Sequence, residues 1–248
     1  MKVLLLAAGR GTRISRYLGG DPKCTVDIGG IRLIQYTIDM LERKGIREIA
    51  MVLGYNAARI REVLQGHDIR YFYNPFFDVT NSIGSAWFAK EFLTDSDDIC
   101  IMNADVYMEE ALFDRVLSCV KSPVMFADGS RKENADYKFR YHDGILEKYG
   151  KELQGDDITG EYVGIGRFSR DFVPVLVSEM DRMIGNQEHS VWWENILYSM
   201  VGTEQPVYVE EIDGLFWAEV DYIEDYQRIL AFRGYTSDGM SNIRPLNG

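Results

Sequence analysis

The feature of the sequence that most limits its fold is an alternation, along the first half of the chain, of short apolar runs with longer stretches that carry apolar residues at helical spacing. The apolar runs are residues 3–6, 49–53, 69–73 and 99–103. Such an alternation builds βα units that feed a largely parallel sheet. It predicts an α/β fold with a Rossmann-like mixed, mostly parallel sheet flanked by helices. The helices are expected at residues 33–44, 57–64, 85–92, 109–120, 172–184, 190–201 and 222–232.

The second half of the chain contains a hairpin signal. Residues 137–141 and 145–149 have strand propensity, and an Asp-Gly turn signal lies between them at Asp143 and Gly144. We expect a small β-hairpin insertion or lid over about residues 128–165. Later strands are expected at residues 207–211 and 216–220. The pattern is interpreted as one domain over residues 1–235, followed by a polar C-terminal tail over residues 236–248.

Composition and charge disfavour several classes of function. With 248 residues, 46% of them hydrophobic, the chain can bury a sizeable core. Its formal net charge of −12 argues against a nucleic-acid partner, because an extended nucleic-acid surface neutralises many phosphates with Lys and Arg. No run is long enough to span a bilayer, and the first apolar run is shorter than a signal-peptide core. We therefore expect a cytoplasmic protein with no membrane partner.

The cysteines and histidines carry no catalytic or metal-binding pattern. Cys24, Cys100 and Cys119 are widely spaced and form no CxxC pair, which favours buried reduced thiols over a disulfide framework or a zinc site. The three histidines are not in a metal-ligand spacing. The chemistry of the protein is therefore expected to come from carboxylates and basic side chains.

A glycine-rich loop follows the first expected strand directly, where the carboxyl end of a sheet opens toward a ligand. Its small residues let backbone amides approach phosphates, and we expect the loop to bind a nucleotide. The loop residues are Leu6, Ala7, Ala8, Gly9, Gly11 and Thr12. The loop is not a Walker loop, and Ile14 stands where a dinucleotide motif has its third glycine, so a dinucleotide-binding oxidoreductase is disfavoured. Arg13, and Lys23 stiffened by Pro22, are expected to face the same triphosphate.

Three carboxylates follow or end expected strands. Asp105 comes after the strand at 99–103, at the edge where the glycine-rich loop lies. Glu219 and Asp221 are two positions apart on a strand, so both point to one face, and two like charges so close need a cation. Magnesium fits, since it prefers carboxylate and phosphate oxygens. The alternatives are that Asp221 only caps the last helix together with Glu224, and that Glu219 is simply exposed to solvent.

Two further segments offer binding groups. Between residues 80 and 87 a loop of small polar residues, including Asn81 and Ser85, can read a base edge, or Asn81 or Ser82 can simply cap a helix. Trp192, Trp193 and Glu194 set two large aromatic rings beside a carboxylate, which can hold an ammonium group by cation-π and charge contacts. The alternative for the tryptophans is a place in the core.

The motif L-A-A-G-x-G-T-R at residues 6–13, with Pro22 and Lys23 after it, resembles the signature of the nucleotidyltransferase family that makes nucleotide sugars and CDP-linked precursors. The T-N-x-x-x-S stretch at residues 80–85 is similar to the phosphocholine cytidylyltransferase branch of that family. The resemblance implies that Asp105 and Asp221, with Glu219 beside them, bind the metal, and that the nucleotide is CTP. It also implies that Lys138, on the hairpin, approaches the acceptor phosphate. The segment Trp192 to Asn195 is similar to the element that lines the acceptor site of the choline-type enzymes.

The implied reaction is transfer of CMP from CTP to a small phosphorylated or phosphonate acceptor, with release of pyrophosphate. Lys23, Arg13 and Lys138 would stabilise the reacting phosphates together with magnesium. Phosphocholine, phosphoethanolamine, aminoethylphosphonate and phosphoglutamine all fit as acceptors. By the same resemblance, the product would decorate a surface or capsule polysaccharide or a lipid.

Several alternatives stay open from the sequence. One is a sugar-1-phosphate nucleotidyltransferase that uses UTP or dTTP, and another is a non-catalytic domain that binds nucleotides. The cations and carboxylates that accompany the glycine-rich loop count against the second. Association into a homo-oligomer also stays open.

Overall fold

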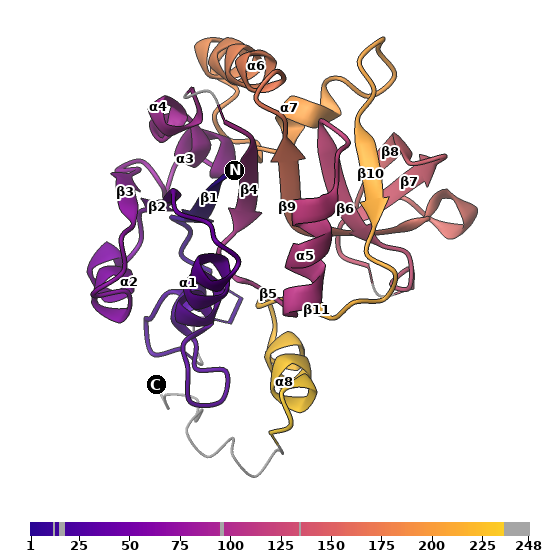
Figure 1. Cartoon of the computed structure of the whole chain (residues 1–248). Helices are drawn as coiled ribbons and strands as arrows, with labels where there is room; N and C mark the ends of the chain where they lie inside the picture. The colour runs from indigo at the N-terminus through magenta and orange to yellow at the C-terminus, as the bar shows by residue number, and fades with distance from the viewer. Residues whose placement is uncertain (12, 15–17, 95–96, 134, 236–248) are drawn as a thin grey trace.

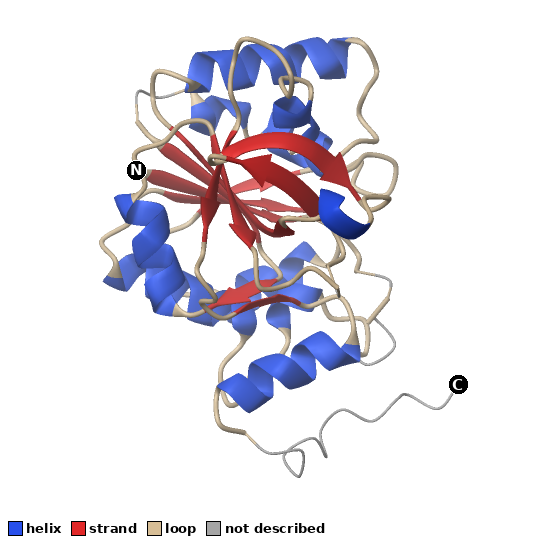
Figure 2. Cartoon of the chain, turned by 90° about the vertical axis from the view of Figure 1, so that its right-hand side faces the viewer, coloured by secondary structure: helices blue, strands red, loops and turns tan. Residues whose placement is uncertain are grey.

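The computed structural model describes residues 1–11, 13–14, 18–94, 97–133 and 135–235. Thr12, expected in the nucleotide-binding loop, and the expected tail at 236–248 lie outside the described residues. The described part forms a central sheet with helices on both faces (Figures 1 and 2). In spatial order, its strands are β3 (Arg70–Tyr73), β2 (Ile49–Leu53), β1 (Lys2–Ala7), β4 (Ile99–Asn103), β9 (Gly160–Phe168), β6 (Val124–Asp128), β10 (Tyr208–Glu211), β8 (Ile145–Gly150) and β7 (Lys138–His142).

The strand directions confirm the expected mixed, mostly parallel sheet. Strands β3, β2, β1 and β4 are parallel to one another, and β6 is parallel to β10. Strand β9 runs antiparallel between β4 and β6, and β8 runs antiparallel to β10. Strands β1, β2 and β6 are buried along their whole length, as expected for strands covered by helices on both faces.

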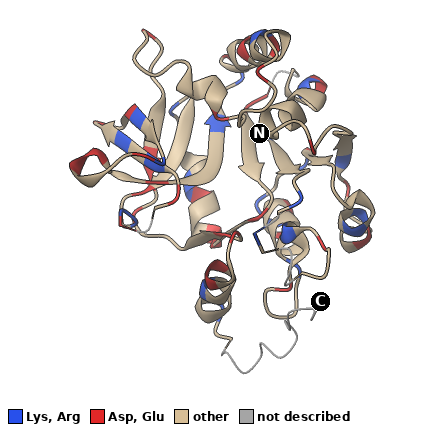
Figure 3. Ribbon diagram, turned by 180° about the vertical axis from the view of Figure 1, so that it is seen from behind, with Lys and Arg blue, Asp and Glu red and all other residues tan. Residues whose placement is uncertain are grey.

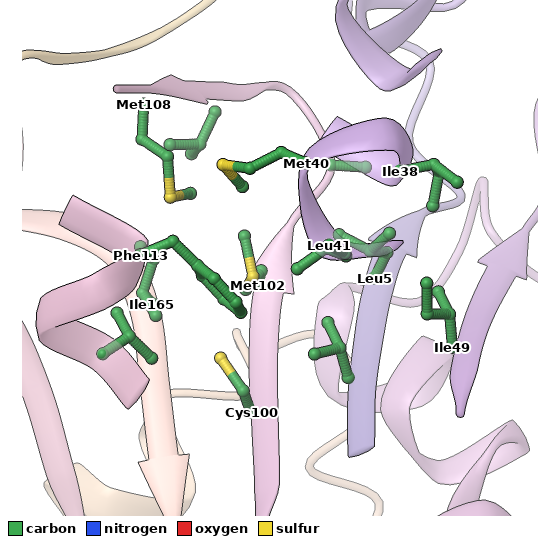
Figure 4. Packing of buried hydrophobic residues seen from close by; sticks show 14 of the residues in the cluster. Leu5, Ile38, Met40, Leu41, Ile49, Cys100, Met102, Met108, Phe113 and Ile165 are labelled. Atoms are coloured by element: carbon green, nitrogen blue, oxygen red, sulfur yellow. The ribbon is translucent and has the colours of Figure 1, made fainter. Parts of the chain in front are cut away.

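Helices cover both faces of the sheet with apolar side chains. On one face lie α1 (Leu33–Arg43), α2 (Ala57–Val63) and α5 (Glu110–Ser118), which share a core with β1, β4 and β9. Figure 4 shows Leu5 and Met102 from two of these strands among the side chains of α1 and α5. The other face carries α3 (Ser82–Phe88), α4 (Lys90–Leu93), α6 (Val173–Gly185) and α7 (Asn195–Tyr198).

A small second sheet lies beyond the carboxyl ends of the central strands (Figure 2). It pairs β5 (Val106–Met108) with β11 (Trp217–Glu219) in antiparallel register, so that Glu219 stands opposite Val106. The backbone N–H of Val220 donates to the carbonyl of Asp105 at 3.0 Å. Helix α8 (Ile223–Phe232) then packs on this sheet through a third apolar cluster. This pairing brings two segments that are far apart in the sequence to one place.

The expected hairpin is confirmed. The turn between β7 and β8 contains Asp143 with φ of 49° and Gly144 with φ of 71°. Both values are in the left-handed region that two-residue hairpin turns require, which explains the Asp-Gly pair. The hairpin extends the central sheet, since β8 pairs with β10 and β7 pairs with the start of β9.

The structure differs from the sequence expectations in two regions. The sequence pattern predicts no strand at β5, β6 or β9, and β9 contains Gly164 and Gly166, which weaken strand propensity. A Cβ on Gly166 would lie 2.6 Å from the ring of Trp193, so packing requires a glycine there. The helix expected at 190–201 is wrong over most of its length, because only α7 within it is an α-helix.

The backbone before α7 bonds to another segment instead of forming a helix. The carbonyls of His189 and Val191 accept from the N–H groups of Asn81 and Ile83, and the N–H of Trp193 donates to Oγ of Ser82. These groups are therefore not available for a helical ladder.

No helix in the described part of the chain has the length and apolar character needed to cross a membrane. Charged residues of both signs lie along the helices and on the hairpin, whereas the central strands are almost free of them (Figure 3).

Candidate active site

The candidate active site lies at the carboxyl ends of β1 and β4. The carbonyl of Leu6, near the end of β1, accepts from the N–H of Ala104 at 3.1 Å, which holds the two strand ends together. A cavity of about 130 Å³ opens there. It is lined by Leu6, Ala7, Gly9, Gly11, Pro22, Lys23, Cys24, Ala104 and Asp105. The structure thus brings most of the glycine-rich loop together with Lys23 and Asp105.

Gly11 has a specific steric role in this loop. Its φ is +64°, and a Cβ at this position would lie 2.4 Å from Cγ of Lys23. Any other residue would therefore be strained and would collide with the lysine side chain. Lys23 opens the short 3-10 helix η2 (Lys23–Thr25), which is held by a hydrogen bond of 2.8 Å from Oγ1 of Thr25 to the carbonyl of Pro22. The glycine loop and the Pro-Lys pair therefore act together to place one ammonium group.

The ammonium of Lys23 lies among the predicted metal ligands. Its Nζ is 3.4 Å from Oδ2 of Asp105 and donates a hydrogen bond to Asp221. Arg13 makes an ion pair with the other oxygen of Asp221. Burial alone would lower the pKa of Lys23, but the carboxylates of Asp105 and Asp221 outweigh it, so the pKa is raised and the group stays charged.

Glu219 completes a cluster of three carboxylates. One oxygen from each of Asp105, Glu219 and Asp221 lies within 4.8 Å of the others. Burial, with the nearby charges of Asp105 and Asp221, raises the pKa of Glu219 well above its ordinary value. Burial also raises the pKa of Asp105, although the charge of Lys23 opposes this. Such a set of hard oxygen donors fits a divalent cation, which would relieve the mutual repulsion.

The alternative that Asp221 caps the last helix is wrong. Helix α8 begins at Ile223 with Tyr222 as its N-cap residue, and the carboxylate of Asp225 accepts from the N–H of Tyr222 at 3.0 Å. Asp221 instead faces Lys23 and Arg13. Glu219 is only partly exposed and faces the carboxylate cluster, so simple solvent exposure does not describe it.

A second cavity, of about 270 Å³, lies between the glycine-rich loop and the start of α3. It is lined by Leu6, Ala8, Gly9, Phe77, Thr80, Asn81, Ser82, Ser85, Asn103, Asp105, Trp192, Glu194 and Glu219. Asn81 is also the N-cap residue of α3, where its Oδ1 accepts from the N–H of Ser82 at 2.8 Å. Asn81 therefore caps α3, as one alternative expected, and its side chain also lines the cavity.

Asn74 supports this second cavity from behind, a role that the sequence did not indicate. It is fully buried, and its Nδ2 donates to Oγ1 of Thr80 at 3.0 Å and to Oγ of Ser85 at 3.1 Å. Its Oδ1 accepts from the N–H of Phe76 at 2.9 Å. The amide thus uses both donor and acceptor to fix the loop before α3.

A third cavity, of about 240 Å³, adjoins the second, since Asn103, Trp192, Glu194 and Glu219 line both. It is lined by Arg13, Asn103, Asp136, Tyr137, Lys151, Tyr162, Trp192, Glu194, Tyr198, Glu219 and Asp221. Its aromatic walls pack on one another, since the ring of Tyr137 lies 5.4 Å from that of Trp192 and 5.6 Å from that of Tyr198. Burial raises the pKa of Glu194 to about 7. Two of the predicted acceptor groups, Trp192 and Glu194, therefore lie at this cavity.

Trp193 does not lie with them, and the expectation that it contacts an acceptor is corrected. Its side chain has no exposed surface, and its ring meets that of Phe168 edge-on at 6.0 Å and packs over Gly166. Consecutive residues of this segment point in opposite directions, so Trp192 reaches the cavity while Trp193 fills the core.

Lys138 is also placed away from the cavity. Its Nζ donates to the carbonyls of Lys151 at 2.8 Å and Leu153 at 3.0 Å, so it holds the turn that follows β8. The lysine that lines the cavity is Lys151, whose Nζ donates to Oδ2 of Asp136 at 2.7 Å and lies 6.0 Å from the ring of Trp192. No sequence pattern distinguished Lys151, because its position depends on how the hairpin turns back.

The chain is similar to known proteins over most of its length. A CTP:phosphoglutamine cytidylyltransferase of Campylobacter jejuni is 25% identical over 92% of this chain and 98% of its own length. A choline-phosphate cytidylyltransferase of Streptococcus pneumoniae is 27% identical over 92% of this chain and 96% of its own length. The solved structure of the CTP:phosphocholine cytidylyltransferase from Streptococcus pneumoniae has a TM-score of 0.77, with 23% identity, and the match covers 94% of this chain and 98% of that one.

The resemblance inferred from the glycine-rich loop is therefore confirmed at the level of the family. The model of the MobA-like NTP transferase domain matches residues 3–165, which include the glycine-rich loop, Lys23, Asp105 and the hairpin. The chain therefore belongs to the MobA-like NTP transferase domain family.

Proposed function

We propose that this nucleotidyltransferase transfers CMP from CTP to a small phosphorylated or phosphonate acceptor, in the presence of magnesium, and releases pyrophosphate. One observation supports this most strongly. Arg13 and the carboxylates of Asp105, Glu219 and Asp221, with Lys23 bonded to them, stand where two adjoining cavities meet, one beside the glycine-rich loop and one with aromatic walls. This is the arrangement that joining a nucleotide to a second small molecule requires.

In the proposed reaction an oxygen of the acceptor phosphate attacks the α-phosphorus of CTP. A new P–O bond forms there, the bond from the α-phosphorus to the oxygen bridging the β-phosphorus breaks, and pyrophosphate leaves. The attacking oxygen is already anionic, so no general base is needed. Lys23 and Arg13 hold and neutralise the phosphates, and catalysis rests on positioning and charge.

The three carboxylates are the proposed magnesium ligands. Magnesium, when bound to Asp105, Glu219 and Asp221, would neutralise charge on the reacting phosphates. Lys23 and Arg13 would then turn from Asp221 toward the triphosphate. The ion pairs seen here show that both side chains reach the cluster.

We place the nucleoside in the cavity that Asn81 and Ser85 line. The amide of Asn81 and the hydroxyl of Ser85 offer a donor and acceptors to a base edge. Their place in the T-N-x-x-x-S stretch, and the relatives named for CTP, support cytosine.

We place the acceptor in the aromatic-walled cavity. The rings of Tyr137, Trp192 and Tyr198 and the carboxylate of Glu194 suit an amine or ammonium group better than a sugar hydroxyl. Arg13 and Lys151 are the cations at this cavity for the acceptor phosphate, and Lys138 acts by holding the turn that carries Lys151. Phosphocholine, phosphoethanolamine, aminoethylphosphonate and phosphoglutamine fit this chemistry. The product would serve the decoration of a surface polysaccharide or lipid.

The test is pyrophosphate release with magnesium, using CTP, UTP, dTTP, ATP and GTP in turn against phosphorylated amines, amides, polyols and sugars. We expect release with CTP and an aminated acceptor. Release only with UTP or dTTP and glucose 1-phosphate would instead identify a sugar-phosphate enzyme. No release with any pair, while CTP still binds, would identify a nucleotide-binding domain without this chemistry.

The control for this experiment is Asp105→Asn, which removes one carboxylate and keeps the size of the side chain. We expect the variant to lose release and to keep the fold, as judged by circular dichroism. Release at the wild-type rate would contradict the role of the carboxylate cluster.

A further inference from the structure

A fourth cavity, of about 340 Å³, opens on the same carboxylate cluster. It is lined by Arg131, Glu133, Ala135, Asp136, Tyr137, Glu161, Tyr162, Trp217, Ala218, Glu219, Asp221, Tyr222, Asp225 and Arg228. We call it the arginine chamber, after Arg131 and Arg228. It shares Asp136, Tyr137, Tyr162, Glu219 and Asp221 with the aromatic-walled cavity, so a molecule bound in that cavity can extend into the chamber.

Arg131 is held rigidly at the wall of the chamber. Its Nε donates to Oε2 of Glu161 at 2.6 Å, and Glu161 is 5% exposed. Its guanidinium carbon lies 5.8 Å from the centroid of the Trp217 ring. A buried carboxylate and an aromatic face together fix the orientation of the guanidinium before any ligand binds.

Arg228 lies on α8 and contacts β11, the strand that contains Trp217. Its NH2 group donates to the carbonyl of Trp217 at 3.2 Å, and its NH1 group is 3.6 Å from Oδ1 of Asp225. Its guanidinium carbon lies 5.7 Å from the centroid of the Phe216 ring. Burial, and then the nearby charge of Arg131, lower the pKa of Arg228. The two guanidinium groups therefore repel one another across the chamber.

Both arginines keep donors for a ligand. A guanidinium has five N–H donors, and within the described residues Arg131 and Arg228 each make one hydrogen bond. Glu133 and Glu219 also line the chamber, and three further acids there, Glu161, Asp225 and Asp136, are already paired. Glu161 accepts from Arg131 and from the N–H of Asp136, and Asp225 accepts from the N–H of Tyr222. The carboxylate of Asp136 is paired with Lys151.

We infer that the acceptor carries a carboxylate at the end remote from its reacting phosphate, and that this carboxylate binds in the arginine chamber between Arg131 and Arg228. Guanidinium groups match carboxylates in charge and in planar geometry, and an anion between these two would relieve their repulsion. The inference rests on the proposed function and narrows its acceptor to a phosphorylated or phosphonate amino acid or amino-acid amide. A phosphocholine molecule has no second anion and would leave the chamber unused.

The test compares ligands that differ only in that carboxylate. O-phosphoserine is phosphoethanolamine with an added carboxylate, and 2-amino-4-phosphonobutyrate is 3-aminopropylphosphonate with an added carboxylate. The affinity of the full chain for all four ligands is measured by isothermal titration calorimetry, without nucleotide. We expect the carboxylated member of at least one pair to bind about tenfold more tightly, since its carboxylate gains charge-assisted hydrogen bonds from a guanidinium group.

Variants then locate the carboxylate. Arg228→Gln should remove the difference in affinity between the two ligands of the pair and leave the affinity for the ligand without a carboxylate unchanged. Arg228→Lys should restore part of that difference. Arg140→Gln is the matched control, because Arg140 lies on the hairpin and pairs with Glu147 and Asp157. The Arg140→Gln variant should keep the full difference in affinity within the pair.

Equal affinities within both pairs for the wild-type chain would overturn the inference, and so would a difference that persists in Arg228→Gln. Neither outcome depends on turnover. Failure of the proposed cytidylyl transfer is a separate result, seen as absence of pyrophosphate release with CTP.

Discussion

The ammonium of Lys23 donates a hydrogen bond to the carboxylate of Asp221, which lies 198 residues further along the chain. The same ammonium is 3.4 Å from Asp105. One lysine therefore supplies the positive charge between two carboxylates that are the proposed ligands of a metal. A metal ion bound to these carboxylates would replace the ammonium of Lys23, which would then turn to the triphosphate. We therefore expect bound metal to raise the affinity for the nucleotide, and bound nucleotide to raise the affinity for the metal.

Replacing Lys23 with methionine should remove this coupling between metal binding and nucleotide binding. The variant removes the internal cation, so the cluster should bind Mn²⁺ about tenfold more tightly in the absence of nucleotide, as measured by electron paramagnetic resonance. Turnover should fall by a factor of about 10²–10³, because a cation at the reacting phosphates is lost. Lys44→Met is the control, since Lys44 pairs with Asp114 on the surface, and it should change neither quantity. Unchanged Mn²⁺ affinity in Lys23→Met would argue against the exchange.

Gly11→Ala should lower activity through Lys23. The new Cβ would lie 2.4 Å from Cγ of that lysine, so the side chain must move, and we expect turnover to fall about tenfold or more. The positive φ adds strain of about 1–2 kcal/mol, which a thermal melt would report. Gly30→Ala separates the two effects, because Gly30 has φ of +83° but open space around its Cβ. It should show the strain and keep the activity.

The pKa of Glu194 predicts a pH dependence of stability. Burial raises this pKa from 4.5 to about 7, so the folded protein holds a proton that the unfolded chain releases above pH 4.5. The stabilisation is complete below about pH 4.5 and is lost as the pH rises toward 7, by about 3 kcal/mol at most. Urea unfolding of the wild type and of Glu194→Gln at pH 5, 6, 7 and 8 tests this. Relative to the variant, the wild type should lose stability over that range, and a constant difference would count against the raised pKa.

The two neighbouring tryptophans should behave differently. Trp193→Ala removes a fully buried ring from the core and should lower the free energy of unfolding by about 3–5 kcal/mol. Trp192 is 42% exposed at the aromatic-walled cavity, where we propose that the acceptor binds, so Trp192→Ala should cost much less stability but raise the KM for an aminated acceptor. Denaturant melts and acceptor titrations of both variants check this. A Trp193→Ala variant with wild-type stability would contradict its place in the core.

Lys151 and Lys138 should affect acceptor binding through one contact, because Lys138 holds the turn that carries Lys151. Lys151→Met should raise the KM for the acceptor about tenfold, because Lys151 lines the cavity. Lys138→Met should raise it less, since Lys138 only holds the turn at Lys151 and Leu153. In a double variant the second change should add nothing, which a double-mutant cycle would reveal. Lys148→Met, on the exposed face of the hairpin, is the control. Additive effects would mean that Lys138 contacts the acceptor by itself.

Much of the site was predictable because its parts are local. A glycine-rich loop after a buried strand, a Pro-Lys pair, and Asp105 just after another buried strand each carry their meaning within a few residues. Since the carboxyl ends of parallel strands meet at one edge, the sequence also implied that they converge. The Asp143-Gly144 turn was predictable for the same reason, because its left-handed φ values select those residues.

The remaining features of the fold and of the candidate site depended on contacts between segments that are distant in the sequence. The sequence alone determined the α/β alternation, the glycine-rich loop with Arg13 and Lys23 after it, and the pair of carboxylates at Glu219 and Asp221. Only the tertiary structure decided that Lys151 rather than Lys138 lines the aromatic-walled cavity and that Trp192 rather than Trp193 faces it. It also decided that Arg131 and Arg228 share a chamber. The physical reason is that strands such as β9 and β11 take their place by pairing with partners far along the chain, which no local pattern specifies.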